Sequence, residues 1–256
     1  MIKTKYAAAL KTIIGTRDEQ QDCAFQQIDG NRVVAAVCDG MGGLESGRLA
    51  SALTIEKFKE LLERKAPAES FSSFYLNSVD ILDELVFHLK NEHGEKLAAG
   101  TTFLSVAIEN NELSWLSVGD SRLYILRGNE FVQVTRDHNY FLQLDQMKLE
   151  ISENQYKAET ARGEVLISFI GMGGIEVMDI SHSPFKLLPN DTVLLSTDGL
   201  YKALNDEEIM QCLRTEDVEE AVTLLINRVY EKAHQFQDNT TCVVIKYNGE
   251  AEYEAH

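Results

Sequence analysis

Long hydrophobic runs are missing from this sequence of 256 residues, and no apolar stretch approaches the ~18 to ~20 residues of a membrane-spanning helix. The first apolar run, from Tyr6 to Leu10, is interrupted at Lys11 and is shorter than the ~7 to ~15 residues of a signal-peptide core. We therefore expect no membrane partner, and we interpret Tyr6–Thr12 as an edge β-strand.

Cysteine is scarce, and its residues form no CxxC pair. Three of them lie in strand-like surroundings, so we interpret them as reduced core residues and expect a cytoplasmic protein. Neither an HxxxH motif nor a cluster of Cys and His is present, which argues against a zinc site. The cysteines are Cys23, Cys38, Cys212 and Cys242.

Basic residues are in the minority, with 24 Lys and Arg against 41 Asp and Glu. The formal net charge is −17 and the sequence pI is near 4.7. Such a field excludes binding to nucleic acid or to an anionic membrane through overall charge. Most of the surplus carboxylates are expected at the solvated surface, but some could form cation sites.

No linker or break in composition divides the chain, and 44% of its residues are hydrophobic, enough for a substantial core. The predicted order is strands, two helices, strands, two helices and a last strand. That order favours an α+β fold of two sheets with helices outside. We expect one domain over residues 1–256, with a polar tail at 248–256.

Local patterns predict the first elements. Cys23–Ile28 and Arg32–Cys38 read as a hairpin joined by Asp29-Gly30-Asn31. Apolar residues at helical spacing predict helices over about 49–64 and about 71–93. Four β-like runs joined by turn dipeptides then predict one antiparallel meander, because two-residue loops cannot join parallel strands. These runs are Thr101–Glu109, Glu112–Val118, Ser121–Arg127 and Glu130–Val134.

The segment from Asn139 to Gly174 is the least regular part of the chain. We expect it to form a flap-like insertion with one short amphipathic helix around Phe141 to Leu144. It ends in Gly171-Met172-Gly173-Gly174, which repeats the four residues at Gly40–Gly43. No further similarity surrounds the two copies, so we treat the repeat as chance.

The most informative stretch is the apolar run Val33–Cys38, which ends in Asp39 and is followed by three glycines within four residues. An aspartate at the end of a buried strand is costly unless something pairs with it, and a divalent cation is a common partner. The alternative is a plain strand-to-turn junction, where Asp-Gly is frequent.

Four further aspartates stand at the ends of predicted strands. Asp198 directly follows the predicted strand Thr192–Thr197, and Asp238 precedes the last strand. Asp120 lies in a turn between strands, and Asp22 lies at the start of a strand. Such oxygen ligands suit Mg²⁺ or Mn²⁺. Two such cations can generate a hydroxide and stabilise displacement at phosphorus. Five acids at strand ends are hard to explain by turns alone.

With these residues in view, the chain resembles the metal-dependent serine/threonine protein phosphatases of type 2C, the PPM family, and its bacterial members in particular. The matching segments run in family order over nearly the whole chain. They are Arg17 with Gln20-Gln21-Asp22, Asp39 to Gly43, Gly100-Thr101-Thr102, Gly119-Asp120-Ser121-Arg122, Thr135-Arg136-Asp137-His138, Ser196 to Leu200, and Asp238-Asn239-Thr240-Thr241.

The resemblance implies an α-β-β-α sandwich of two antiparallel sheets, with helices on both outer faces and two Mn²⁺ or Mg²⁺ ions at one edge. By motif position, Asp39 should bridge both ions and the Gly40 carbonyl should bind one. Asp198 and Asp238 should hold the other. Asp22 should act through metal-bound water.

The same resemblance gives Arg17 the role of clamping the substrate phosphate, since a guanidinium suits two-point contact with phosphate oxygens. The nucleophile would be a metal-bridging hydroxide, with no phosphoenzyme. The implied function is hydrolysis of phosphoserine and phosphothreonine in proteins, which makes phosphorylated products of a Ser/Thr kinase the expected partners.

Three positions depart from the family pattern. Met41 stands where many eukaryotic members carry a proposed general-acid His, and Gln21 stands where some members carry Glu. Lys202 stands where members with a third metal carry an acid, which leaves a third site at Asp120 open. We expect the Lys202 side chain to point to solvent; the alternative is that its ammonium replaces the third cation.

Two other functions remain in view. The first is a catalytically weak or inactive relative that binds phosphoproteins, although Asp39, Asp198 and Asp238 are all present. The second is a nucleotide-binding protein that uses Gly40–Gly43 as a phosphate loop, but the lysine of a P-loop is missing after these glycines.

Overall fold

The computed structural model describes residues 5–42, 46–147, 152–232 and 236–249. One sheet has the strand order β1-β12-β11-β7-β8, and the other has the order β10-β6-β5-β3-β2, with β4 paired to β3 and β9 paired to β6. The strands of the first are β1 (Tyr6–Ile13), β7 (Arg122–Arg127), β8 (Glu130–Gln133), β11 (Thr192–Ser196) and β12 (Thr240–Tyr247). Those of the second are β2 (Asp22–Asp29), β3 (Arg32–Gly42), β4 (Ala99–Thr101), β5 (Phe103–Glu109), β6 (Glu112–Val118), β9 (Asp179–Ile180) and β10 (Phe185–Lys186).

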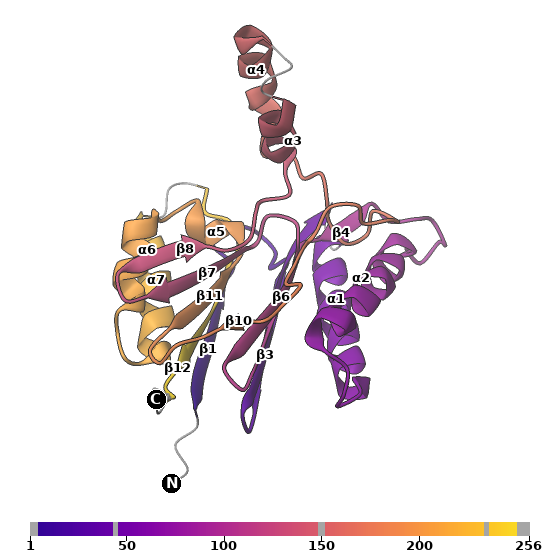
Figure 1. Cartoon of the computed structure of the whole chain (residues 1–256). Helices are drawn as coiled ribbons and strands as arrows, with labels where there is room; N and C mark the ends of the chain where they lie inside the picture. The colour runs from indigo at the N-terminus through magenta and orange to yellow at the C-terminus, as the bar shows by residue number, and fades with distance from the viewer. Residues whose placement is uncertain (1–4, 43–45, 148–151, 233–235, 250–256) are drawn as a thin grey trace.

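Helices cover the outer face of each sheet (Figure 1). The long helices α1 (Ser46–Arg64) and α2 (Phe71–Phe87) lie on the β3 sheet, and α6 (Asp206–Leu213) and α7 (Val218–Lys232) lie on the β12 sheet. All strand pairs are antiparallel. The expected α-β-β-α sandwich is therefore confirmed. No helix within the described ranges is both long enough and apolar enough to span a bilayer.

Strand β3 shows why the central strands are apolar throughout. Val34, Ala36 and Cys38 pack into the core under α1 and α2. The alternate residues Val33 and Val37 pack between the two sheets. Because successive side chains of a strand point to opposite faces, a strand buried on both faces needs a continuous apolar run.

The predicted meander is wrong in its middle. β5 and β6 pair in one sheet, whereas β7 and β8 pair in the other. Residues Gly119–Ser121 therefore cross between the sheets instead of forming a hairpin. Gly119 has φ +105°, and a Cβ there would lie 2.7 Å from the Thr102 side chain, so the crossing needs glycine. The crossing brings Asp120 into the space between the sheets.

Helix α2 is shorter than predicted, since it ends at Phe87 instead of about residue 93. The Asn91 side chain accepts hydrogen bonds from the backbone N–H groups of His93 and Glu95, both at 2.9 Å. An Asn that bonds the backbone ahead of it competes with helical hydrogen bonding, which accounts for the early end.

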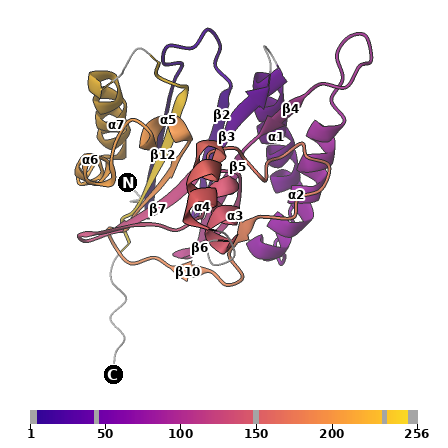
Figure 2. The same cartoon turned by 90° about the horizontal axis from the view of Figure 1, so that it is seen from above.

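The insertion contains two helices where one was predicted, α3 (Tyr140–Met147) and α4 (Glu153–Glu159), followed by a 3-10 turn at Thr160–Arg162. Both helices project away from the sandwich, above the edge where β4 and α5 (Asp198–Tyr201) lie (Figure 1). The view from above places them over the gap between the two sheets (Figure 2). Ser152 and Gln155 form a reciprocal cap at the start of α4, a signal the polar sequence carried and the prediction missed. Of the predicted tail, residues 250–256 lie outside the described ranges.

Candidate active site

Four of the five predicted aspartates reach one edge of the sandwich because of strand direction. Asp22 and Asp39 are directly opposite each other on β2 and β3. Both are in phase with neighbours that pack between the sheets, so their side chains face that space. Asp198 follows the end of β11, and Asp238 precedes the start of β12, its antiparallel partner. These ends therefore coincide.

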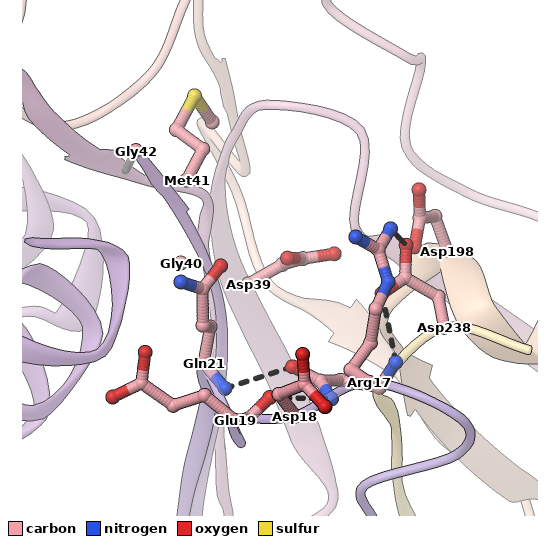
Figure 3. A pocket seen from close by; sticks show the side chains of 11 residues that line it. Arg17, Asp18, Glu19, Gln21, Asp39, Gly40, Met41, Gly42, Asp198 and Asp238 are labelled. Carbon is pink, nitrogen blue, oxygen red and sulfur yellow. Dashed lines mark hydrogen bonds and ion pairs between the residues drawn. The ribbon is translucent and has the colours of Figure 1, made fainter. Parts of the chain in front are cut away.

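A cavity of about 460 Å³ lies at this edge. Figure 3 shows the carboxylates of Asp39, Asp198 and Asp238 and the guanidinium of Arg17 facing a common space. Its lining is mostly polar and comes from the loop after β1, the end of β3, and the strand ends at β11 and β12. The lining residues are Arg17, Asp18, Glu19, Gln21, Asp39, Gly40, Met41, Gly42, Asp198, Asp238 and Asn239.

The crowding of these carboxylates shifts their proton affinities. Burial raises the pKa of Asp39 well above its usual range, and the charges of Asp22 and Asp198 raise it further. Burial, with the charges of Asp198 and Asp238, raises the pKa of Asp22 to about 7, although hydrogen bonds from two threonines oppose the shift. Without positive charge between them, these groups resist being ionised together.

Two carboxylate oxygens at the site fit a divalent cation. Asp22 Oδ1 and Asp198 Oδ1 are buried, and neither has a hydrogen-bond partner within the described ranges. A buried, unpaired carboxylate oxygen is costly, and hard cations such as Mn²⁺ and Mg²⁺ take oxygen ligands of this kind.

Two aspartates of the site, Asp238 and Asp198, each form an ion pair with a basic side chain. Arg17 Nη2 lies 2.7 Å from Asp238 Oδ2, and Lys202 Nζ lies 2.8 Å from Asp198 Oδ2. In the part of the chain that the structure describes, no three His, Cys, Asp or Glu side chains are gathered as a ready metal cage.

Thr101 and Thr102, which the sequence marked only as part of a matching motif, hold Asp39 in place. The Asp39 backbone N–H donates to Thr102 Oγ1 at 2.8 Å, and its carbonyl accepts from Thr101 Oγ1 at 2.9 Å. Thr102 Oγ1 is in turn 2.7 Å from Ser121 Oγ, on the crossing between the sheets. The Gly-Thr-Thr and Gly-Asp-Ser motifs therefore fix the backbone that presents Asp39.

The loop that carries Arg17 is fixed by Asn239. Its side-chain amide donates to the carbonyls of Ile14 and Glu19 at 2.8 and 3.1 Å, and its side-chain oxygen accepts from the Gln21 backbone N–H at 2.8 Å. The sequence analysis gave Asn239 no role of its own. Its one signal there was its place next to Asp238 in a matching motif.

Asp120 does not line the main cavity. It lines a neighbouring one of about 280 Å³ together with Lys202, Tyr201 and the insertion residues Phe141 and Glu164. Burial and the charge of Asp198 raise the pKa of Asp120 to about 6, and the charge of Lys202 opposes this. Tyr201 Oη donates to the Asp120 carbonyl at 3.0 Å.

The expectation that Lys202 points to solvent is wrong. Its ammonium contacts Asp198 Oδ2 and lies 3.3 Å from Glu164 Oε2, so it joins the site to the insertion. Burial lowers the pKa of its ammonium, but the carboxylates of Asp198, Glu164 and Asp120 outweigh burial and raise the pKa. Lys202 is thus a fixed cation at the position left open for a third metal. No sequence signal marked Glu164.

His138 has a structural role beside the crossing between the sheets. Its side chain is fully buried, and Nδ1 accepts from the backbone N–H of Gly119 at 3.1 Å. Arg122 forms two hydrogen bonds with the Asp137 carboxylate, at 2.9 and 2.7 Å. Both contacts brace the crossing that carries Asp120.

Fold and cavity together define an α-β-β-α sandwich with a carboxylate-lined site between its sheets. The family profile described as Protein phosphatase 2C matches residues 14–236 of this chain. The chain belongs to the protein phosphatase 2C family, and the resemblance drawn from the sequence is confirmed.

Relatives and solved structures agree with this assignment. The serine/threonine phosphatase stp of Listeria welshimeri is 24% identical over 235 residues, which cover 90% of each chain. The S. agalactiae serine/threonine phosphatase has the same fold, with a TM-score of 0.80, 24% identity, and coverage of 94% of this chain and 99% of that one. The catalytic domain of PstP in complex with two manganese ions is 25% identical, with a TM-score of 0.74 and coverage of 94% and 97%.

Proposed function

We propose that the chain is a metal-dependent phosphatase that hydrolyses phosphoserine and phosphothreonine in proteins. The observation that carries the proposal is the convergence of Asp22, Asp39, Asp198 and Asp238 at one edge, where two buried carboxylate oxygens have no hydrogen-bond partner among the described residues. Relatives named as serine/threonine phosphatases support the substrate class. Substrates phosphorylated by a Ser/Thr kinase are part of the proposal.

The proposal also covers the domain organisation of the chain and its cellular compartment. Residues 1–256 act as one catalytic domain, and 139–174 form a flap-like insertion above the site. The four cysteines are all outside disulfides, which supports a reducing, cytoplasmic setting.

The proposed ligands of two Mn²⁺ or Mg²⁺ ions are Asp39, the Gly40 carbonyl, Asp198 and Asp238, with Asp22 acting through water. Ions held there would supply a hydroxide nucleophile from water and positive charge beside the phosphate, so that the phosphoester is cleaved directly. A structure of PstP that holds two manganese ions supports the count of two.

Arg17 would hold the phosphate. One of its nitrogens is on Asp238, its side chain is 61% exposed, and a guanidinium has five N–H donors, so donors remain for phosphate oxygens. Asp238 therefore orients Arg17 across the cavity. Met41 carries no proton that it could give to the leaving alkoxide, and we propose water as the proton donor in its place.

The alternative is a catalytically weak or inactive relative that binds phosphoproteins. The Gln21 side chain in the cavity favours weak binding of one metal, since an amide oxygen is a poorer ligand than a carboxylate. The four aspartates and Arg17 favour catalysis.

The decisive experiment measures release of phosphate from a panel of phosphopeptides by protein stripped of metal and then supplied with Mn²⁺ or Mg²⁺. We expect activity only with added metal, and its loss on addition of EDTA. An Asp39→Asn protein serves as the matched control for contaminating phosphatase. Full activity in the stripped sample would end the metal proposal. Binding of phosphopeptides without any turnover in Mn²⁺ would establish the alternative.

A further inference from the structure

A groove of about 460 Å³ adjoins the candidate active site, and Met41 and Gly42 line both hollows. Gly171 and Met172 line the same groove. The two copies of the Gly-Met-Gly sequence, 131 positions apart as Met41 and Met172 (172 − 41), therefore meet at one groove. The repeat has no wider similarity around it, but both copies serve the same surface.

The second copy is held rigidly by a buried carboxylate with no part in the proposed catalysis. Asp83 of α2 is 3% exposed, and it accepts hydrogen bonds from the backbone N–H groups of Gly171, Met172 and Gly174 at 2.6, 2.9 and 2.6 Å. Gly171 has φ +107°, and a Cβ there would lie 2.7 Å from the Val86 side chain. The fold therefore fixes the loop that presents Met172.

The chemistry of the groove is apolar. Met41, Phe87, Leu97, Phe169 and Met172 supply its side-chain surface. Among the described residues that line it, Lys96 alone carries a charge, and its ammonium lies 3.1 Å from the centroid of the Phe87 ring. Methionine side chains are flexible and polarisable, so they accommodate apolar groups of differing shape.

The position of the groove limits what can occupy it. A β-strand rises about 3.3 Å per residue, so Met41 lies about 7 Å along β3 from Asp39. An extended peptide spans the same distance with two residues. A substrate whose phosphate lies at Asp39 and Arg17 can therefore reach the groove with a side chain from one of its next two residues.

We propose that this groove binds an apolar side chain of the phosphoprotein, within two residues of the phosphorylated Ser or Thr. This inference rests on the proposed phosphatase function and adds a preference in substrate sequence. The two methionines and the Asp83-anchored loop form the binding surface. The preference is expected to be modest, because one apolar side chain in a pocket discriminates by about 10-fold to 200-fold, and this groove is open on one side.

The test uses phosphothreonine peptides that are identical except for Leu, Ser or Glu at each of the two positions on either side of the phosphothreonine. With Mn²⁺ present, kcat/KM for the Leu peptide should exceed that for the Ser peptide by about 10-fold at one of these positions. Met172→Ser should reduce this ratio to about 1. Met172→Leu, the matched control, should keep it. Met172 is 39% exposed, so we expect its replacement to leave the fold intact.

Each outcome separates this inference from the function on which it rests. Turnover of all peptides with no preference for Leu would overturn the groove and leave the phosphatase function standing. A preference for Glu would show that the groove binds an acidic side chain through Lys96, and it would refute an apolar occupant. A Leu preference that persists in Met172→Ser and in Met172→Glu would place recognition elsewhere. No turnover of any peptide, nor of p-nitrophenyl phosphate by the parent protein, would overturn the proposed function itself.

Discussion

Replacing Lys202 is the most informative perturbation, because its ammonium takes one oxygen of a proposed metal ligand. Lys202 Nζ is 2.8 Å from Asp198 Oδ2 and 3.3 Å from Glu164 Oε2. Lys202→Asp removes this cation and adds a carboxylate beside Asp198 and Asp120. Both changes favour a cation in the smaller cavity, which Asp120 and Lys202 line beside Asp198. Lys202→Met, which removes the charge alone, is the matched control.

The structure sets the size of the effect. A hydrogen bond between charged groups contributes about 1.5 to 3 kcal/mol, and the 45% exposure of the Lys202 side chain reduces this by solvent screening to about 1 to 2 kcal/mol. Lys202→Met should therefore tighten Mn²⁺ binding at the Asp198 site by about 5-fold to 30-fold. Lys202→Asp should in addition bind one more Mn²⁺ per chain, and its rate should respond to Mn²⁺ at higher concentrations than the parent's rate does.

Isothermal titration with Mn²⁺ measures both affinity and count, and anomalous scattering from crystals soaked in MnCl₂ locates the ions. Equal metal counts in the parent and in Lys202→Asp would refute the reasoning that Lys202 excludes a third cation. A third ion in the parent would show that the ammonium never stood in its place.

Three further perturbations test the site. Asp39→Asn should abolish turnover more completely than any other single change and remove high-affinity Mn²⁺ binding with the fold retained; circular dichroism and titration check this, and a near-normal rate would contradict the assignment. Arg17→Ala should lower kcat/KM by about 10-fold to 150-fold, the value of a charge-assisted hydrogen bond, without weakening Mn²⁺ binding. If instead Mn²⁺ binding collapses while phosphate inhibition survives, Arg17 is structural. The raised pKa of Asp22, about 7, means that the metal-free folded state binds more protons than the unfolded chain. Stability should therefore fall as pH rises from about 4 to about 7, and Asp22→Asn should flatten this trend in melts without metal. Identical pH profiles in the two proteins would show that Asp22 is not the group responsible.

Much of the fold could be predicted because local patterns agree with tertiary contacts. Strand β6 has the predicted boundaries, and β3 begins at the predicted residue. Each has strong periodicity or a long apolar run bounded by turn residues. Where a local polar contact competes with that pattern, as Asn91 does beyond α2, the periodicity alone overestimated the length of the helix.

The sequence motifs named the residues of the candidate site one by one. They did not predict which cavity each residue lines or which side chains contact one another. The sequence placed five aspartates at strand ends, and strand direction brings four of them to one edge of the sandwich, where Asp39, Asp198 and Asp238 line a cavity. It could not place Asp120 in a cavity of its own, because β6 and β7 are both apolar on two faces and could have paired with each other. It also gave no sign of Glu164, whose contact with Lys202 joins positions 38 residues apart (202 − 164).

What the sequence by itself determined is the chemistry: which acids end strands, which arginine accompanies them, and which lysine replaces an acid. Those features are local, because a residue's type and its place on a strand are set within a few positions. Only the tertiary structure decided which sheet each strand joined, that Lys202 faces inward, and that two distant Gly-Met-Gly segments form one groove. Such outcomes depend on the packing of whole layers against one another, which lowers the free energy through contacts between residues far apart in the chain.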